Sequence, residues 1–219
     1  MLRGLLAALA CLPALAQEPV SVIERRAVPI ASASRDSTLK LHVTLAKLED
    51  TGWEDERVQD AAREAGSILA QCEIALESAE LVRIRAPERY RDFLSPVSRE
   101  LARAVPLPRP VIWFVRDTRQ RPAFDAEAIG RGNSRTRPEL ADSVWVTRAT
   151  RDLGIALAHE LAHVLMDSGE HTDEPGNLMR EETAPSNTAL SPQQCARLRD
   201  TATANGLLRP PAPAGQGPQ

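Results

Sequence analysis

Apolar and polar residues alternate between positions 39 and 45, and a period of two is typical of a half-buried strand. At 111–115 the run Val-Ile-Trp-Phe-Val is apolar throughout, which indicates a strand buried on both faces near the centre of a sheet. Shorter apolar runs predict further strands at 72–76, 81–84, 127–130 and 144–146. The segment at 81–84 either continues the strand at 72–76 or pairs with it.

Other segments carry apolar residues every three or four positions, the spacing of one helix face. A helix is predicted over 54–71, and its acidic first turn suits the positive end of the helix dipole. Residues 87–104 are predicted to be helical in part, ending before the proline-rich run at 106–110. A third helix is expected to use Thr150 as its N-cap and carries an apolar face up to Leu165.

The last predicted helix begins at Ser191, with Pro192 at its first position and Gln194 at its third. This combination is a capping box with the favoured N-terminal proline. Strands and helices in this order predict an α+β fold built on a twisted mixed β-sheet.

The start of the chain has the pattern of a secretory signal peptide. Residues 1–16 combine a basic residue, a short apolar stretch and small residues at the end, so we expect cleavage after Ala16. Lipidation of Cys11 is the less favoured alternative, because such sites usually carry a larger aliphatic residue than Ala8 three positions earlier. The mature protein is therefore expected to be secreted or periplasmic.

Length and composition predict one folded domain, since 219 residues suffice to bury a substantial core. The predicted divisions are a signal peptide at 1–16, an extended lead-in at 17–37, the domain at 38–207 and a disordered Pro/Gly-rich tail at 208–219. The formal net charge of −3 becomes −4 without the one arginine of the signal, so nothing indicates nucleic-acid binding. No later segment has the roughly 20 apolar residues of a membrane-spanning helix.

Two cysteines remain once the signal peptide is removed, Cys72 and Cys195. An even pair in an oxidising compartment predicts a disulfide. Such a bond would tie the end of the first predicted helix to the start of the last.

Residues 159–171, HELAHVLMDSGEH, hold three of the four histidines of the chain. His159 and His163 are four positions apart, so on a helix their side chains lie one turn apart on the same face. Glu160 lies beside them, where a carboxylate can act on a water without binding the metal itself. A catalytic zinc ion needs a third protein ligand and an open position for water.

His171 is the predicted third ligand. Gly169 would let the chain leave the helix through a left-handed turn and bring His171 back toward the first two histidines. Zinc held by three neutral imidazoles would lower the pKa of its water to about 7. Glu160 would take a proton from that water as it attacks an amide carbonyl and pass the proton to the departing amine, so no serine or cysteine nucleophile is needed.

With these residues the chain resembles the metzincin clan of zinc metallopeptidases, as a small exported member of bacterial type. The clan pattern is H-E-x-x-H-x-x-G-x-x-H followed by a methionine turn, and here His159, Glu160 and His163 match its first half. The resemblance implies a metzincin-like fold in which an active-site helix and a C-terminal helix flank a zinc cleft. It also implies Met179, at the position of the methionine turn, as a hydrophobic floor under the metal, and the strand at 127–130 as an edge along which substrate lies.

The sequence departs from the clan pattern in its spacing. Gly169 and His171 follow His163 by six and eight residues, where the clan has three and six. Some members use an aspartate as the third ligand, so Asp167 is the alternative to His171. The tyrosine that some members carry two residues after the methionine is replaced by Glu181, so its auxiliary role is absent.

The resulting prediction is a secreted zinc-dependent endopeptidase that acts on protein or peptide substrates. Two alternatives remain open. A thermolysin-like peptidase would take its third ligand from Glu181 or Glu182 on a later helix, although the following TAPSNTALSP does not favour a helix. A non-catalytic zinc-containing binding domain would have no need of Glu160, whose presence therefore favours the enzyme.

Overall fold

The computed structural model describes residues 19–30 and 39–210. The predicted signal peptide with Cys11, residues 17–18 and 31–37 of the lead-in, residue 38 of the domain and residues 211–219 of the tail lie outside the described residues. The strands are β1 (Ser21–Pro29), β2 (Leu39–Leu48), β3 (Ile74–Arg85), β4 (Asp92–Phe93), β5 (Val111–Phe114), β6 (Asp117–Thr118), β7 (Ala126–Ile129), β8 (Ser143–Val146) and β9 (Leu208–Arg209). The helices are α1 (Asp55–Leu69), α2 (Ser95–Ala104), α3 (Leu153–Met166) and α4 (Pro192–Ala204). Within the described ranges, no helix is both long and apolar enough to span a membrane.

Seven strands form one mixed sheet in the order β1-β3-β2-β5-β8-β7, with β9 pairing to β2. The inner strands β3, β2, β5 and β8 run parallel, whereas β1 and β7 at the edges are antiparallel to their neighbours. All four residues of β5 are buried. The predicted central strand and the α+β fold class are therefore confirmed.

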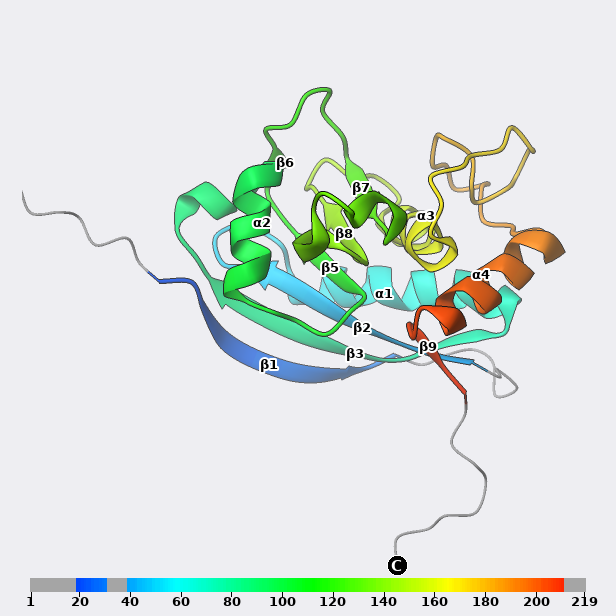
Figure 1. The fold of residues 1–219 in the computed structure, drawn as a ribbon, viewed down its shortest axis with the longest axis horizontal. Helices are drawn as coiled ribbons and strands as arrows, with labels where there is room; N and C mark the ends of the chain where they lie inside the picture. The colour runs from blue at the N-terminus through cyan, green and yellow to red at the C-terminus, as the bar shows by residue number, and fades with distance from the viewer. Residues whose placement is uncertain (1–18, 31–38, 211–219) are drawn as a thin grey trace, which may run out of the picture.

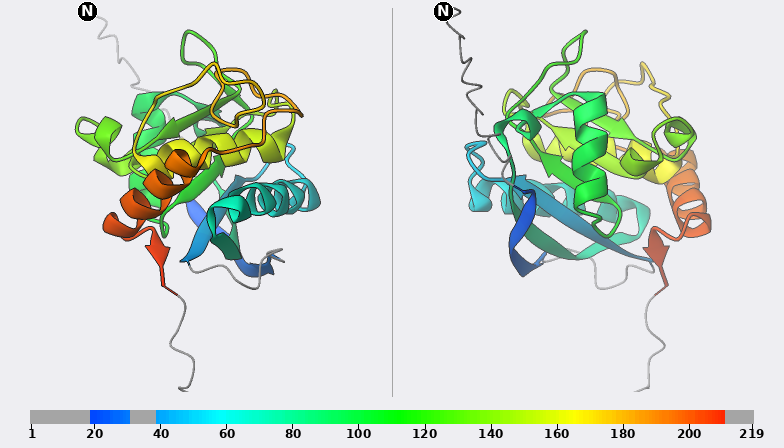
Figure 2. Two further views of the ribbon diagram at one scale, coloured as in Figure 1. Left: turned by 90° about the vertical axis from the view of Figure 1, so that its right-hand side faces the viewer. Right: turned by 60° about the vertical axis from the view of Figure 1, so that its left-hand side comes forward.

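Helices cover both faces of the sheet (Figure 1). On one face, α1 and α3 share an apolar core with the strands and with α4. On the other face, α2 packs over a second core that contains Trp113 and Trp145, whose stacked rings lie 5.1 Å apart. The left view of Figure 2 has α1, α3 and α4 toward the reader, and the right view has α2. Burial of these two apolar layers from water is the main source of stability.

Two segments outside the expected domain take part in the sheet. The predicted lead-in contains β1, which is hydrogen-bonded to residues 78–85 of β3 and is therefore extended but not loose. Val28 and Ile30 reach into the core and are 3% and 5% exposed. Residues 208 and 209 of the predicted tail form β9 on β2, and Leu207 and Leu208 are buried.

Two predictions inside the domain are made more definite by the structure. Of the two alternatives for the run at 81–84, the structure shows the continuous one: Ile74–Arg85 form one long strand, β3, and Cys72 lies in the 3-10 turn before it. The segment at 87–104 is helical only in part, as expected, and it starts with a 3-10 turn at Glu88–Tyr90 followed by β4. α2 then begins at Ser95 and ends at Ala104, before the proline-rich run.

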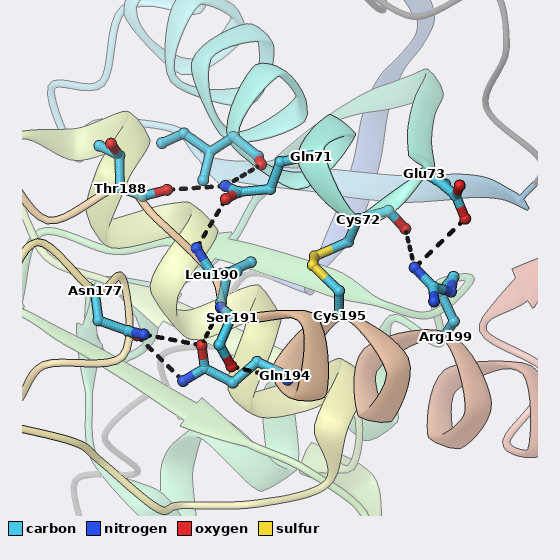
Figure 3. The surroundings of a disulfide bond; sticks show 11 residues. Gln71, Cys72, Glu73, Asn177, Thr188, Leu190, Ser191, Gln194, Cys195 and Arg199 are labelled. Atoms are coloured by element: carbon cyan, nitrogen blue, oxygen red, sulfur yellow. Dashed lines mark hydrogen bonds and ion pairs between the residues drawn. A yellow bond between two sulfur atoms is a disulfide. The ribbon is translucent and has the colours of Figure 1, made fainter. Parts of the chain in front are cut away.

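The predicted disulfide between Cys72 and Cys195 is present. It joins the 3-10 turn that follows α1 to the first turn of α4 (Figure 3). The capping box is confirmed as well, because the Gln194 N–H donates to Ser191 Oγ at 3.2 Å and the Ser191 N–H donates to Gln194 Oε1 at 2.7 Å. The start of α4 is thus held both by its cap and by a covalent bond to the end of α1.

Candidate metal centre

The helix that carries the first two histidines, α3, is buried along its whole length, because it packs against α1, α4, β7 and β8. Its start differs from the prediction. Asp152, in the left-handed conformation with φ of 42°, precedes the helix, and no side chain caps it. Thr150 Oγ1 donates instead to the carbonyl of Asp125. This bond ties the entry of α3 to the segment that leads into β7.

Three imidazole nitrogens converge beside α3. Nε2 of His163 lies 2.9 Å from Nε2 of His159 and 3.2 Å from Nε2 of His171. Among the residues that the structure describes, these three form a group whose ligand atoms all lie within 4.8 Å of one another. The structure therefore brings together the three histidines that the sequence predicted as a metal site.

Backbone carbonyls fix the orientation of two of the rings. His159 Nδ1 lies 2.7 Å from the carbonyl oxygen of Leu178, and His163 Nδ1 lies 2.7 Å from that of Ser168. A carbonyl can only accept, so each Nδ1–H donates and each Nε2 presents a lone pair. Burial lowers the pKa of both rings, to about 4 for His163. Both are therefore neutral at neutral pH, as metal binding requires.

The cluster fits a tetrahedral zinc ion. The Nε2 lone pairs of His159 and His163 face one another at 2.9 Å and repel unless a cation lies between them, and Nε2 of His171 lies 3.2 Å from that of His163. Two ligands at about 2.0–2.1 Å from a tetrahedral zinc ion are separated by roughly 3.3 Å, which is close to both distances. Neutral imidazole nitrogens are ordinary zinc ligands, and three of them leave a fourth position open.

Asp167, rather than Gly169, makes the left-handed turn at the end of α3. Asp167 has a φ of 48°, whereas Gly169 does not have a positive φ, so the predicted role of this glycine is wrong. Aspartate enters this region more readily than most residues with a side chain. Asp167 Oδ1 accepts a hydrogen bond from the Gly132 N–H at 2.5 Å. The carboxylate therefore faces the loop after β7, and His171 is the third member of the cluster.

Glu160 lies in the same hollow as the three histidines. It is 9% exposed, and the backbone of Ala128 in β7 lies beside its carboxylate and favours the charged form. Burial, together with the nearby charge of Glu127, raises the pKa of Glu160 to about 8. A cation held by the neighbouring imidazoles would favour the charged form instead. This position suits a group that exchanges protons next to a metal.

Two adjoining hollows form a cleft along α3. The first has a volume of about 380 Å³ and contains the histidines and Glu160. The second, of about 860 Å³, shares His159, Glu160, Ala126 and Glu181 with the first and extends along the start of α3. The remaining acidic lining of this second hollow consists of Asp125, Asp152 and Glu182. The sequence indicates Glu182 only as a possible metal ligand, and it does not predict Asp125 and Asp152 as site residues. No local motif joins these residues, because they come from separate loops.

The loop between α3 and α4 does not support the thermolysin-like alternative. Glu181 and Glu182 lie in a non-helical segment, and neither belongs to the metal-ligand group found among the described residues. The alternative required a glutamate on a helix as the third ligand, and His171 holds that place. Met179 is 1% exposed and lines a small hollow together with His171. The loop therefore returns to the metal site at Met179.

No protein-family model matches the sequence, and no curated protein matches it. The fold is similar to the crystal structure of metalloproteinase-II from Bacteroides fragilis, with a TM-score of 0.56 and 17% sequence identity. The match covers 80% of this chain and 57% of that chain, so this chain spans little more than half of its length. The chain therefore has a metalloproteinase-like α+β fold with a three-histidine metal site.

Proposed function

We propose that this protein is an exported zinc-dependent endopeptidase that hydrolyses peptide bonds in proteins or peptides. The observation that carries the proposal is the convergence of three histidine Nε2 atoms, at 2.9 and 3.2 Å, in the hollow that also contains the buried Glu160. The similarity of the fold to a metalloproteinase structure supports the proposal.

His159, His163 and His171 would hold the zinc ion. When bound, zinc polarises a carbonyl group and activates water for attack. The Glu160 carboxylate takes up a proton from the attacking water and delivers it to the nitrogen of the departing amine. The backbone of Ala128 in β7 favours the charged form of this carboxylate, and burial keeps the carboxylate beside the reacting groups.

The edge strand β7 offers a place for the substrate backbone. Within the described sheet, β7 pairs with β8 on one side and forms the end of the strand order on the other. An extended peptide can add to such an edge as a further strand, with backbone hydrogen bonds supplying affinity. Ala126 and Ala128 of β7 line the hollow that contains Glu160. A peptide on this edge would therefore lie beside the histidines.

Two features support the proposal that the protein is exported. The pattern of residues 1–16 is that of a signal peptide cut after Ala16. The bond between Cys72 and Cys195 supports export, because disulfides persist mainly in oxidising compartments outside the cytosol. The mature protein would be secreted or periplasmic.

A non-catalytic zinc-containing domain is the competing class. A structural zinc site usually closes with four protein ligands, whereas the ligand group found within residues 19–30 and 39–210 has three members. A binding domain also has no use for a buried carboxylate beside the ligands. Both observations favour catalysis.

The test compares the wild type with Glu160→Gln, with the zinc content of each measured. Glutamine keeps the size of the side chain but cannot accept the proton, so kcat/KM for peptide hydrolysis should fall by about 10²- to 10⁴-fold while the zinc content is unchanged. Glu56→Gln, on the exposed surface of α1, is the matched control and should keep full activity. Equal activity in all three proteins, or none in a zinc-loaded wild type, would contradict the proposal.

A further inference from the structure

Two amide side chains connect the start of α4 with the loop that reaches the metal site (Figure 3). Asn177 lies in the loop between α3 and α4 and is 3% exposed. Its amide faces that of Gln194, in the first turn of α4, and the two exchange hydrogen bonds in both directions. Neither residue has a part in the proposed reaction, so the reason for this partly buried polar pair lies elsewhere.

Every hydrogen-bonding position of the Asn177 amide is occupied. Nδ2 donates to Gln194 Oε1 at 3.0 Å and to Glu174 Oε2 at 3.1 Å. Oδ1 accepts from Gln194 Nε2 at 3.2 Å and from the Met179 N–H at 2.9 Å. The Met179 N–H can only donate, so the atom that faces it must be the oxygen, and this fixes the orientation of the amide. A buried amide with all its partners is held in one position.

Gln194 is held in turn by the start of α4. Its Oε1 also accepts from the Ser191 N–H, and its own N–H donates to Ser191 Oγ, as the capping box requires. The next residue, Cys195, is bonded to Cys72 at the end of α1. The amide pair therefore joins the loop to a turn that is anchored covalently to another helix.

The Asn177 amide acts on the peptide group between Leu178 and Met179. Oδ1 accepts from the N–H of this group, and the carbonyl of the same group accepts the His159 Nδ1–H at 2.7 Å. The peptide group is planar, so its N–H and C=O cannot turn independently. Holding the N–H in place therefore also holds the carbonyl that orients the first histidine.

Given the zinc site of the proposed function, we propose that Asn177 and Gln194 are positioning residues that raise zinc affinity by fixing the ring of His159. The pair holds the planar group whose carbonyl keeps the hydrogen on His159 Nδ1 and directs Nε2 toward the other two imidazoles. Without the amide pair, the peptide group between Leu178 and Met179 can rotate. The Nε2 atom of His159 then points at the ion for less of the time. Partners behind a metal ligand typically change metal affinity by about 10- to 100-fold.

The experiment measures the zinc Kd of the whole protein by competition with a chromophoric chelator. Asn177→Ala should weaken zinc binding by about 10- to 100-fold. Gln194 acts on the His159 ring through Asn177, one hydrogen bond further away, so Gln194→Ala should weaken it by about tenfold. Gln194→Glu keeps the oxygen that accepts from the Ser191 N–H, and glutamate also serves in a capping box, but it puts an oxygen in place of the Nε2 that donates to Asn177 Oδ1. It should therefore keep the cap of α4 and still weaken zinc binding at least as much as Gln194→Ala does.

Ser191→Ala is the matched control for stability. It removes the hydroxyl cap of α4 but leaves the side-chain bonds of Gln194, so it should lower Tm without changing zinc affinity. A zinc Kd for Gln194→Ala equal to that of the wild type, or an equal loss in Ser191→Ala, overturns the inference. If Asn177→Ala does not fold, the comparison of the two Gln194 variants with Ser191→Ala decides.

The same measurement separates this inference from the proposed function. Zinc affinity is read without any substrate, so a protein that binds zinc with the expected ranking of variants but cleaves no peptide supports the inference and refutes the peptidase. A wild type that binds no zinc overturns both. An active peptidase whose zinc affinity is the same in all variants overturns the inference alone.

Discussion

Whether the three imidazoles can bind one ion depends on how single residues turn the chain after α3. Asp167 adopts the left-handed conformation and accepts the hydrogen bond from Gly132. A Cβ added at Gly130 or Gly132 would lie 3.0 or 3.2 Å from Asp167 Oδ1, so the absence of side chains there makes room for the carboxylate. Asp167 is thereby used to join α3 to the loop after β7, and His171 is the residue that turns back to the other ligands.

Substitutions at these two positions should have very different effects on zinc binding. His171→Ala removes a ligand, so the zinc Kd should rise by more than about 100-fold, beyond the effect of losing a partner behind a ligand. Asp167→Asn keeps an acceptor for the Gly132 N–H and tolerates a positive φ, so its Kd should stay near that of the wild type. Chelator competition measures both. The opposite ranking would make Asp167 the third ligand.

At the scale of elements, a helix or strand with a strong apolar periodicity could be predicted from the sequence, whereas one with a weak periodicity could not. The helix predicted at 54–71 is α1, Asp55–Leu69, because its apolar residues repeat on one face. β1 gave no such signal, since Val28 is its one buried residue and its arginines reach acidic groups on β3 and α1. Its order comes from pairing with β3, more than 40 residues away, and a local pattern cannot show such a contact.

The disulfide is an element-scale constraint whose contribution can be measured. It closes a loop of 123 residues, which restricts the unfolded chain. The double variant Cys72→Ser with Cys195→Ser should therefore lose about 2–5 kcal/mol of unfolding free energy, as measured by urea titration. The wild type treated with a reducing agent is the control and should lose as much. Equal urea midpoints for the oxidised protein and the double variant would contradict this expectation.

At the scale of the whole molecule, charge is balanced over the chain but not over the cleft. The sequence has 27 basic and 30 acidic residues. Four carboxylates line the first hollow and five the second, with Glu160 and Glu181 in both. Arg151 is the one lysine or arginine among the described residues that line either hollow. The three histidines were predictable because they fall within 13 residues, whereas the acidic lining is assembled only by the fold.

An acidic cleft attracts cationic substrates through its electrostatic field. At low ionic strength, kcat/KM should be about tenfold higher for a peptide with lysine flanks than for the same peptide with glutamate flanks. The difference should shrink as salt rises from about 0.01 M to about 1 M, because the screening length falls from about 30 Å to about 3 Å. Equal rates at low salt, or preference for the acidic peptide, would contradict the role of this charge.

The position of the bound ion shows whether the three histidines form the metal site. Crystals of the zinc-loaded protein, measured on both sides of the zinc absorption edge, locate the ion by its anomalous scattering. One peak is expected, with the Nε2 atoms of His159, His163 and His171 at about 2.0–2.1 Å from it. A peak bound by Asp167 in place of His171, a peak away from α3, or a protein that takes up no zinc would contradict this assignment.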